Sequence, residues 1–79
     1  MRISILPHAR RRMEERGIRE DEVRATLERP DVEYRGSAGR VVAERMPPGR
    51  SLATKVIYNP GLEGERVVVT VERGRPSRR

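Results

Sequence analysis

The only histidine of the chain stands at the head of a row of basic residues spaced four apart. His8, Arg12 and Arg16 fall along one flank of a helix, because an α-helix turns by about 100° per residue. Histidine can act as a base near neutral pH, and arginine can hold two phosphate oxygens at once. This row therefore has the residue types for metal-independent RNA cleavage, with His8 as the general base and the two arginines stabilising the phosphate.

Three further residues are candidates for binding the substrate. Lys55 and Tyr58 lie in an expected strand, and they could assist if that strand faces the histidine row. Thr70 lies in the last expected strand and could position a group by hydrogen bonding. The chain has one histidine, so the second proton-transfer role in such a reaction has no obvious holder.

The same row also fits a purely structural role. In that interpretation His8 hydrogen-bonds a backbone group at the start of the helix. Arg16, which we expect to be the most buried arginine of the row, then pairs with a carboxylate. The candidate partners are Glu20, Asp21, Glu33 and Glu44. The sequence alone leaves the catalytic and the structural interpretation open.

Local start and stop residues predict two helices, over 7–16 and 20–28. Pro7 suits the first position of a helix, and Gly17 suits the left-handed conformation that ends one. Pro30 closes the second helix. We therefore expect two short helices separated by a tight turn.

Apolar residues four apart mark the buried side of each helix. Ala9 and Met13 form this stripe in the first helix, and Val23 and Leu27 form it in the second. Both stripes are expected to face the core.

After the helices the pattern changes to strands separated by turns rich in glycine and proline. The expected strands cover residues 31–35, 40–46, 52–58 and 66–72. Residues 1–6 are expected to be extended or irregular, with Ile3 and Ile5 as a potential short edge strand. The sequence thus predicts an α+β fold, with two N-terminal helices packed on one face of a four-stranded antiparallel sheet.

Composition excludes several classes of protein. The 79 residues include no cysteine and one histidine, so neither a disulfide framework nor an ordinary zinc site is expected, and no cofactor is expected either. No apolar run approaches the roughly 20 residues that span a bilayer, and the start does not resemble a signal peptide. We expect no membrane association and a cytoplasmic location.

The small core suggests assembly. There is no Phe or Trp, and short chains have few buried contacts to spare. The run Val67–Val69 is apolar on both faces of its strand, as expected for a central strand or for one that a partner covers. These features predict a homo-oligomer, for example a dimer formed through the sheet.

The net charge of +6 is concentrated at the C-terminus. Residues 73–79 hold four of the 18 basic residues and none of the 12 acidic ones. We expect a single domain over 1–72 and a disordered basic tail over 73–79. Such a tail can bind phosphate backbones without sequence preference, or it can simply keep the chain soluble.

The motif from His8 to Pro30, with Arg12, Met13 and Arg16–Ile18, together with the valine-rich last strand, resembles the DUF4258 family. The order of two helices and a sheet is similar to that of RelE-type ribonuclease toxins. This resemblance implies a small RNA-interacting protein of toxin type, with RNA and an antitoxin-like protein as partners. The alternative is a non-catalytic, dimeric domain that binds a partner or has a structural role.

Overall fold

The computed structural model describes residues 1–77 and contains two helices, a short 3₁₀ turn and five strands. The elements are β1 (Ile3–Ile5), α1 (Pro7–Arg16), α2 (Glu20–Glu28), β2 (Val32–Arg35), η1 (Ser37–Gly39), β3 (Val41–Arg45), β4 (Ala53–Pro60) and β5 (Arg66–Gly74). The expected α+β class is confirmed, and both helices have the bounds that the sequence predicts.

The sheet differs from the expectation in one strand. Its order is β1-β5-β4-β3-β2, so it has five strands instead of four. Strands β2 to β5 form the expected antiparallel meander, but β1 pairs with β5 in parallel, with Ile3 opposite Arg66 and Ile5 opposite Val68. The prediction of a purely antiparallel sheet was therefore wrong, and the sheet is mixed.

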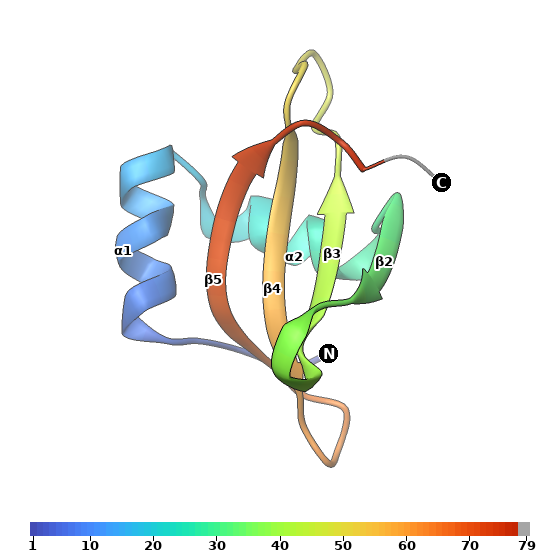
Figure 1. The fold of residues 1–79 in the computed structure, drawn as a ribbon. Helices are drawn as coiled ribbons and strands as arrows, with labels where there is room; N and C mark the ends of the chain where they lie inside the picture. The colour runs from blue at the N-terminus through green and yellow to red at the C-terminus, as the bar shows by residue number, and fades with distance from the viewer. Residues whose placement is uncertain (78–79) are drawn as a thin grey trace.

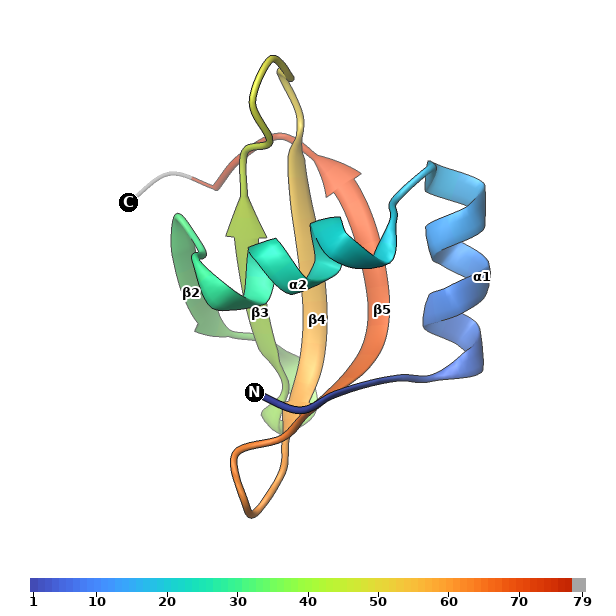
Figure 2. The ribbon, with the colours of Figure 1, turned by 180° about the vertical axis from the view of Figure 1, so that it is seen from behind.

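The two helices occupy different places on the sheet. Helix α2 crosses one face, while α1 lies beside the outer edge of β5 in both views (Figures 1 and 2). The buried stripes of both helices reach the α2-facing side of the sheet, as expected, but only α2 crosses that face and α1 packs at its edge. We call the sheet surface away from α2 the open face, and by strand alternation it carries the side chains of Val42, Glu44, Lys55, Ile57, Thr70 and Glu72.

The ends of α1 follow from the residues that the sequence analysis singled out. Pro7 occupies the first turn, where its missing N–H costs nothing. Gly17 ends the helix in the left-handed conformation, with φ of 65°. The next amide, that of Ile18, turns back to donate to the carbonyl of Met13 at 2.9 Å, which satisfies a helix end that would otherwise be unpaired.

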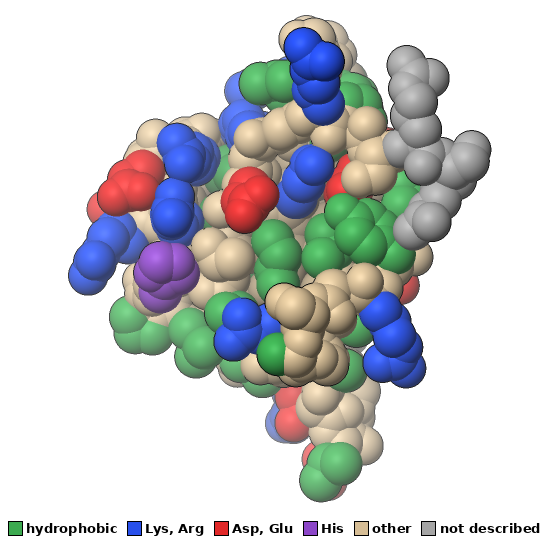
Figure 3. Space-filling model, in the orientation of Figure 1, with side chains coloured by type: hydrophobic (Ala, Val, Ile, Leu, Met, Phe, Trp, Pro, Cys, Tyr) green, Lys and Arg blue, Asp and Glu red, His purple; other side chains and the backbone are tan. Residues whose placement is uncertain are grey.

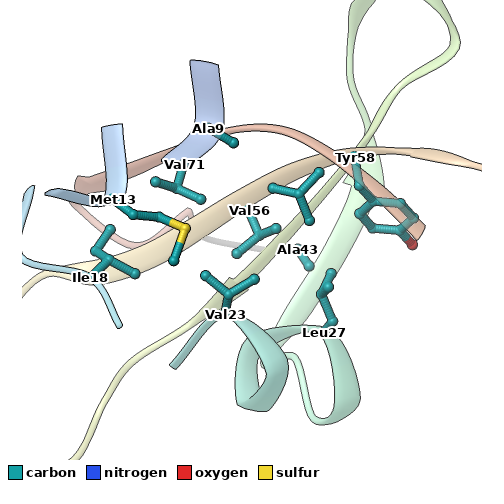
Figure 4. Packing of buried hydrophobic residues seen from close by; sticks show 10 residues of the cluster. Ala9, Met13, Ile18, Val23, Leu27, Ala43, Val56, Tyr58 and Val71 are labelled. Carbon is teal, nitrogen blue, oxygen red and sulfur yellow. The ribbon is translucent and has the colours of Figure 1, made fainter. Parts of the chain in front are cut away.

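The core joins both helices to the α2-facing side of the sheet (Figure 4). The predicted stripe residues Ala9, Met13, Val23 and Leu27 are all buried. The remaining members of the cluster are Ile18, Ala43, Val56, Tyr58, Val68 and Val71. The core holds small aliphatic side chains and one tyrosine, which agrees with the limited apolar supply of the sequence.

Strand β5 is enclosed within the chain. It lies between β1 and β4 and also contacts α1. The register with β4 shifts between Ile57 and Tyr58, which pair with Thr70 and Val68, so Val69 is an extra residue at a bulge. The run Val67–Val69 thus lies in a central strand of the sheet, with Val68 buried and Val67 and Val69 half-buried. The expected oligomer remains a prediction.

The C-terminal segment is ordered further than expected. Strand β5 continues to Gly74, and Arg73 and Ser77 both make hydrogen bonds to the body of the domain. The expected boundary at residue 72 is therefore too early, and residues 73–77 do not form a disordered tail. Arg78 and Arg79 lie outside the described residues.

Candidate functional site

The predicted row lies on α1, on the exposed side of the buried pair Ala9 and Met13. His8 and Arg16 are exposed and Arg12 is half-buried. Helical spacing places the three residues along one flank. Within residues 1–77, their side chains make no hydrogen bond or ion pair. All three therefore remain available to an external ligand.

The row borders the open face of the sheet. In Figure 3, which looks onto this face, the single histidine is the purple side chain at the α1 side, next to blue basic side chains. Hydrophobic side chains gather toward the middle of the same face, over the strands. The histidine and the open face can thus be reached from the same direction.

The structural role expected for Arg16 belongs to another arginine. Arg16 is exposed, and its side chain pairs with none of the four carboxylates proposed as partners. The buried guanidinium is that of Arg73, whose side chain is 11% exposed and pairs with Glu22. Neither residue was predicted as part of a site, because the composition of residues 73–79 indicated a disordered tail and so gave Glu22 no expected partner.

Arg73 holds four elements together. Its Nη1 and Nη2 donate to the two carboxylate oxygens of Glu22 at 2.7 and 3.2 Å. Nη1 also donates to Oγ1 of Thr54 at 3.1 Å. Nη2 and Nε reach the carbonyls of Gly17 and Arg16 at 3.2 and 3.3 Å. One side chain on β5 thus ties β4, the start of α2 and the end of α1, and it fixes the orientation of the helix that carries the row.

The carboxylate of Glu22 is held in its charged form. Burial by itself raises the pKa of Glu22, but the hydrogen bonds from Arg73 and Thr54, together with the nearby positive charges, lower this pKa below its ordinary value of 4.5. The pair is therefore ionic across the neutral range, and it has a structural role.

Lys55 and Thr70 lie on the open face, which is the face of the sheet that the row on α1 borders. The register places Thr70 opposite Ile57, and Lys55 opposite Glu44 on one side and Glu72 on the other. The ammonium group of Lys55 lies 3.7 Å from Oε2 of Glu44. Its charge is thus shared with an internal carboxylate, whereas the row on α1 has no such partner within residues 1–77.

Tyr58 lies on the other side of the sheet. It is 4% exposed and belongs to the core. Its hydroxyl donates to Oε2 of Glu33 at 2.7 Å, and the guanidinium of Arg66 lies 5.3 Å from its ring centre. Burial and the neighbouring Glu33 raise the pKa of Tyr58. The structure does not bring Tyr58 together with His8, Lys55 or Thr70.

The open face carries a buried carboxylate, that of Glu44, which was not among the predicted site residues. Glu44 is 1% exposed, although it lies in the middle of a sheet surface that no helix of residues 1–77 covers. Tyr34 donates its hydroxyl to Oε2 at 2.5 Å. The hydroxyl and amide of Ser77 donate to Oε2 and Oε1 at 2.7 and 2.9 Å. The C-terminal segment is thus anchored over β3 by a single acidic side chain.

These donors keep Glu44 charged. Burial raises the pKa of Glu44, but the amide and hydroxyl of Ser77, the hydroxyl of Tyr34 and the charge of Lys55 together lower it below 4.5. No local sequence motif predicts this cluster, because Ser77 and Tyr34 are 43 residues apart in the chain. The only local hint was an acidic residue that directly follows three apolar residues in an expected strand.

A cavity of about 270 Å³ lies elsewhere, between α2 and the segment that follows β3. Its lining residues are Asp21, Glu22, Ala25, Thr26, Arg45, Pro47 and Pro48. None of the predicted site residues is among them, so the row borders an open surface and not this cavity.

No group of three His, Cys, Asp or Glu residues within 1–77 is placed to hold a metal ion. Neither helix of this part is long and apolar enough to cross a membrane.

Comparison with models of known protein families gives a match. The model of DUF4258, a domain of unknown function, matches residues 5–73. No curated protein and no solved structure matches the chain. The match covers most of the sequence and includes the motif from His8 to Pro30 that carries the resemblance. The chain therefore belongs to the DUF4258 family.

Proposed function

We propose that this protein is a small RNA-interacting protein of the RelE-like toxin type, and that it contacts the RNA backbone through His8, Arg12 and Arg16. The observation that carries the proposal is the state of this row. Three groups suited to phosphate stand together on one helix flank and make no bond to the rest of residues 1–77. Arginines with a structural role look different, since Arg73 has all its contacts inside the domain.

Cleavage is the stronger form of the proposal. In that form His8 takes the proton of the ribose 2′-hydroxyl, the 2′-oxygen bonds to phosphorus, and the bond from phosphorus to the 5′-oxygen breaks, with water giving the 5′-oxygen its proton. Arg12 and Arg16 stabilise the charge that develops on the phosphate. Neither Glu44 nor Tyr58 can easily serve as the second proton-transfer group, because both are buried and hydrogen-bonded. The geometry therefore supports phosphate binding more directly than turnover.

A direct binding test uses labelled single-stranded RNA and fluorescence anisotropy at low salt. The double variant Arg12→Ala/Arg16→Ala should bind at least about tenfold more weakly than the native chain, because it loses two charged contacts. Arg11→Ala is the matched control, since Arg11 lies on the same exposed helix but off the row. If the native chain does not bind RNA, or if Arg11 matters as much as the row, the proposal fails.

A second candidate is a domain that binds a protein partner without catalysis. The observation in its favour is the half-buried apolar group on the open face, which includes Val42 and Ile57. Substitution of Ile57 by Lys should abolish partner binding and leave RNA binding unchanged if this candidate is correct. A pull-down with the protein encoded next to it in the genome, such as an antitoxin-like protein, compares the native chain with this variant.

A further inference from the structure

The outer strand β2 has a backbone edge with which no strand of the described chain pairs. It pairs with β3, and no other strand of residues 1–77 lies on its far side. The amide of Gly36 donates to the carbonyl of Arg40 at 2.8 Å, in continuation of this ladder. In an antiparallel ladder the backbone groups of alternate residues point to opposite sides. The amides and carbonyls of Glu33 and Arg35 therefore point away from β3.

The side chains along this edge are self-complementary. Glu33 and Arg35 are exposed, have opposite charges and lie on the same face of the strand, because one residue separates them. A second strand of the same sequence, running antiparallel about a two-fold axis at Tyr34, places Glu33 opposite the partner's Arg35. The symmetry produces this pair twice.

Other symmetric registers are less favourable. An axis at Glu33 places two carboxylates opposite each other, and an axis at Arg35 does the same for two guanidinium groups. Like charges directly opposite each other destabilise a strand pair, and opposite charges stabilise it. The axis at Tyr34 pairs two residues whose backbone groups both point outward, so the register that charge selects also allows the hydrogen bonds.

We infer that a second copy of this chain binds along β2, so that two five-stranded sheets join into one continuous sheet. The assembly closes as a dimer, because each copy uses its one β2 edge. Four residues per strand span about 13 Å. We therefore expect a weak dimer that depends on protein concentration and on salt. This inference goes beyond the proposed function and does not depend on RNA binding.

The charge pair allows a test that separates pairing from folding. Glu33→Arg produces a chain with two arginines on the edge, and Arg35→Glu produces one with two carboxylates. Each single variant should be monomeric, because its own dimer would oppose like charges. An equimolar mixture should form a heterodimer, because every pair across its two-fold axis then joins an arginine of one chain to a glutamate of the other.

The assembly mass is measured by light scattering and native mass spectrometry. The samples are the native chain, each variant alone and the mixture of the two variants. The expected result is twice the monomer mass for the native chain and the mixture, and the monomer mass for each variant alone. Glu33 also accepts a hydrogen bond from Tyr58, so circular dichroism should first show that both variants are folded. A monomeric native chain overturns the inference. So does a native dimer whose single variants still dimerise, or whose variants do not combine when mixed.

Discussion

Nη1 of Arg73 lies 2.7 Å from Oε2 of Glu22, and this ion pair joins the last strand to the first turn of α2. The side chains are 11% and 18% exposed, so little water screens the pair. Removal of either partner leaves the other charge in a poorly solvated place, which costs more than the loss of a surface ion pair.

Replacement of Arg73 by Met should therefore lower the free energy of unfolding by about 3 kcal/mol. Urea denaturation measures this change. Arg24→Ala is the control, because Arg24 forms an exposed pair with Glu28 at 3.8 Å and should cost less than about 0.5 kcal/mol. Equal effects of the two substitutions would contradict the structural role of Arg73.

The free energy of unfolding should depend on pH through the two buried carboxylates, those of Glu22 and Glu44. The pKa values of Glu22 and Glu44 are lowered in the folded chain from the ordinary value of 4.5. A lowered pKa contributes stability that is present above the unfolded value and is lost as the pH falls through the folded value. Stability should therefore be level from about pH 6 to about pH 5 and fall below that.

A titration of the urea midpoint measures this decline. Glu44→Gln should make the fall shallower, because that variant has one fewer group to protonate. A decline with the same steepness in the native chain and in Glu44→Gln would show that Glu44 has the same pKa in the folded and unfolded states.

These two clusters mark the limit of what the sequence predicts. The bounds of α1 and α2 follow from Pro7, Gly17 and Pro30, which act on the nearest backbone and need no tertiary information. The buried stripes of the two helices also follow from local sequence, because they depend only on the spacing of apolar residues within each helix. The pairing of β1 with β5 is different, because it joins the two ends of the chain, and three extended residues contain nothing that specifies their neighbour.

The candidate site also combines features that are local in the sequence with features that join distant segments. The row on α1 could be predicted because it is a helical period, whereas the partners of Arg73 and Glu44 come from distant segments. The composition of residues 73–79 indicated disorder. In the folded domain, however, Arg73 binds the carboxylate of Glu22, and Ser77 binds that of Glu44. Tyr58 was placed with the row on the assumption that its strand presents it to α1, and the alternation of β4 turns it into the core instead.

The contact between Ser77 and Glu44 should stabilise the domain measurably. Ser77→Ala removes one of the donors of a buried carboxylate and should cost about 1 kcal/mol in thermal or urea unfolding. Ser51→Ala is the matched control, because Ser51 is exposed and its side chain makes no hydrogen bond within residues 1–77. If both variants melt like the native chain, the C-terminal segment is not anchored in this way.

Two truncations should separate the structural and the electrostatic parts of the C-terminus. Deletion of residues 73–79 removes the partner of Glu22 and the cover of Glu44, so the domain should be strongly destabilised. Deletion of residues 78 and 79 alone should weaken RNA binding at low salt, because two positive charges are lost. A full deletion that melts like the native chain would contradict the ordering of residues 73–77.

The salt dependence of RNA binding distinguishes a direct phosphate contact from general attraction. Each neutralised phosphate releases counterions, so the loss of one contact should reduce the slope of log affinity against log salt by about 1. Arg12→Ala should show this reduction, while Arg11→Ala should shift the affinity with a smaller change in slope.

If the chain also cleaves RNA, Arg12→Ala should lower the turnover rate by about 100-fold, as expected for a group that stabilises the transition state. His8→Ala should remove the dependence of cleavage on pH near neutrality. A cleavage rate that neither substitution changes would place the chemistry elsewhere, and the row would then remain a binding surface.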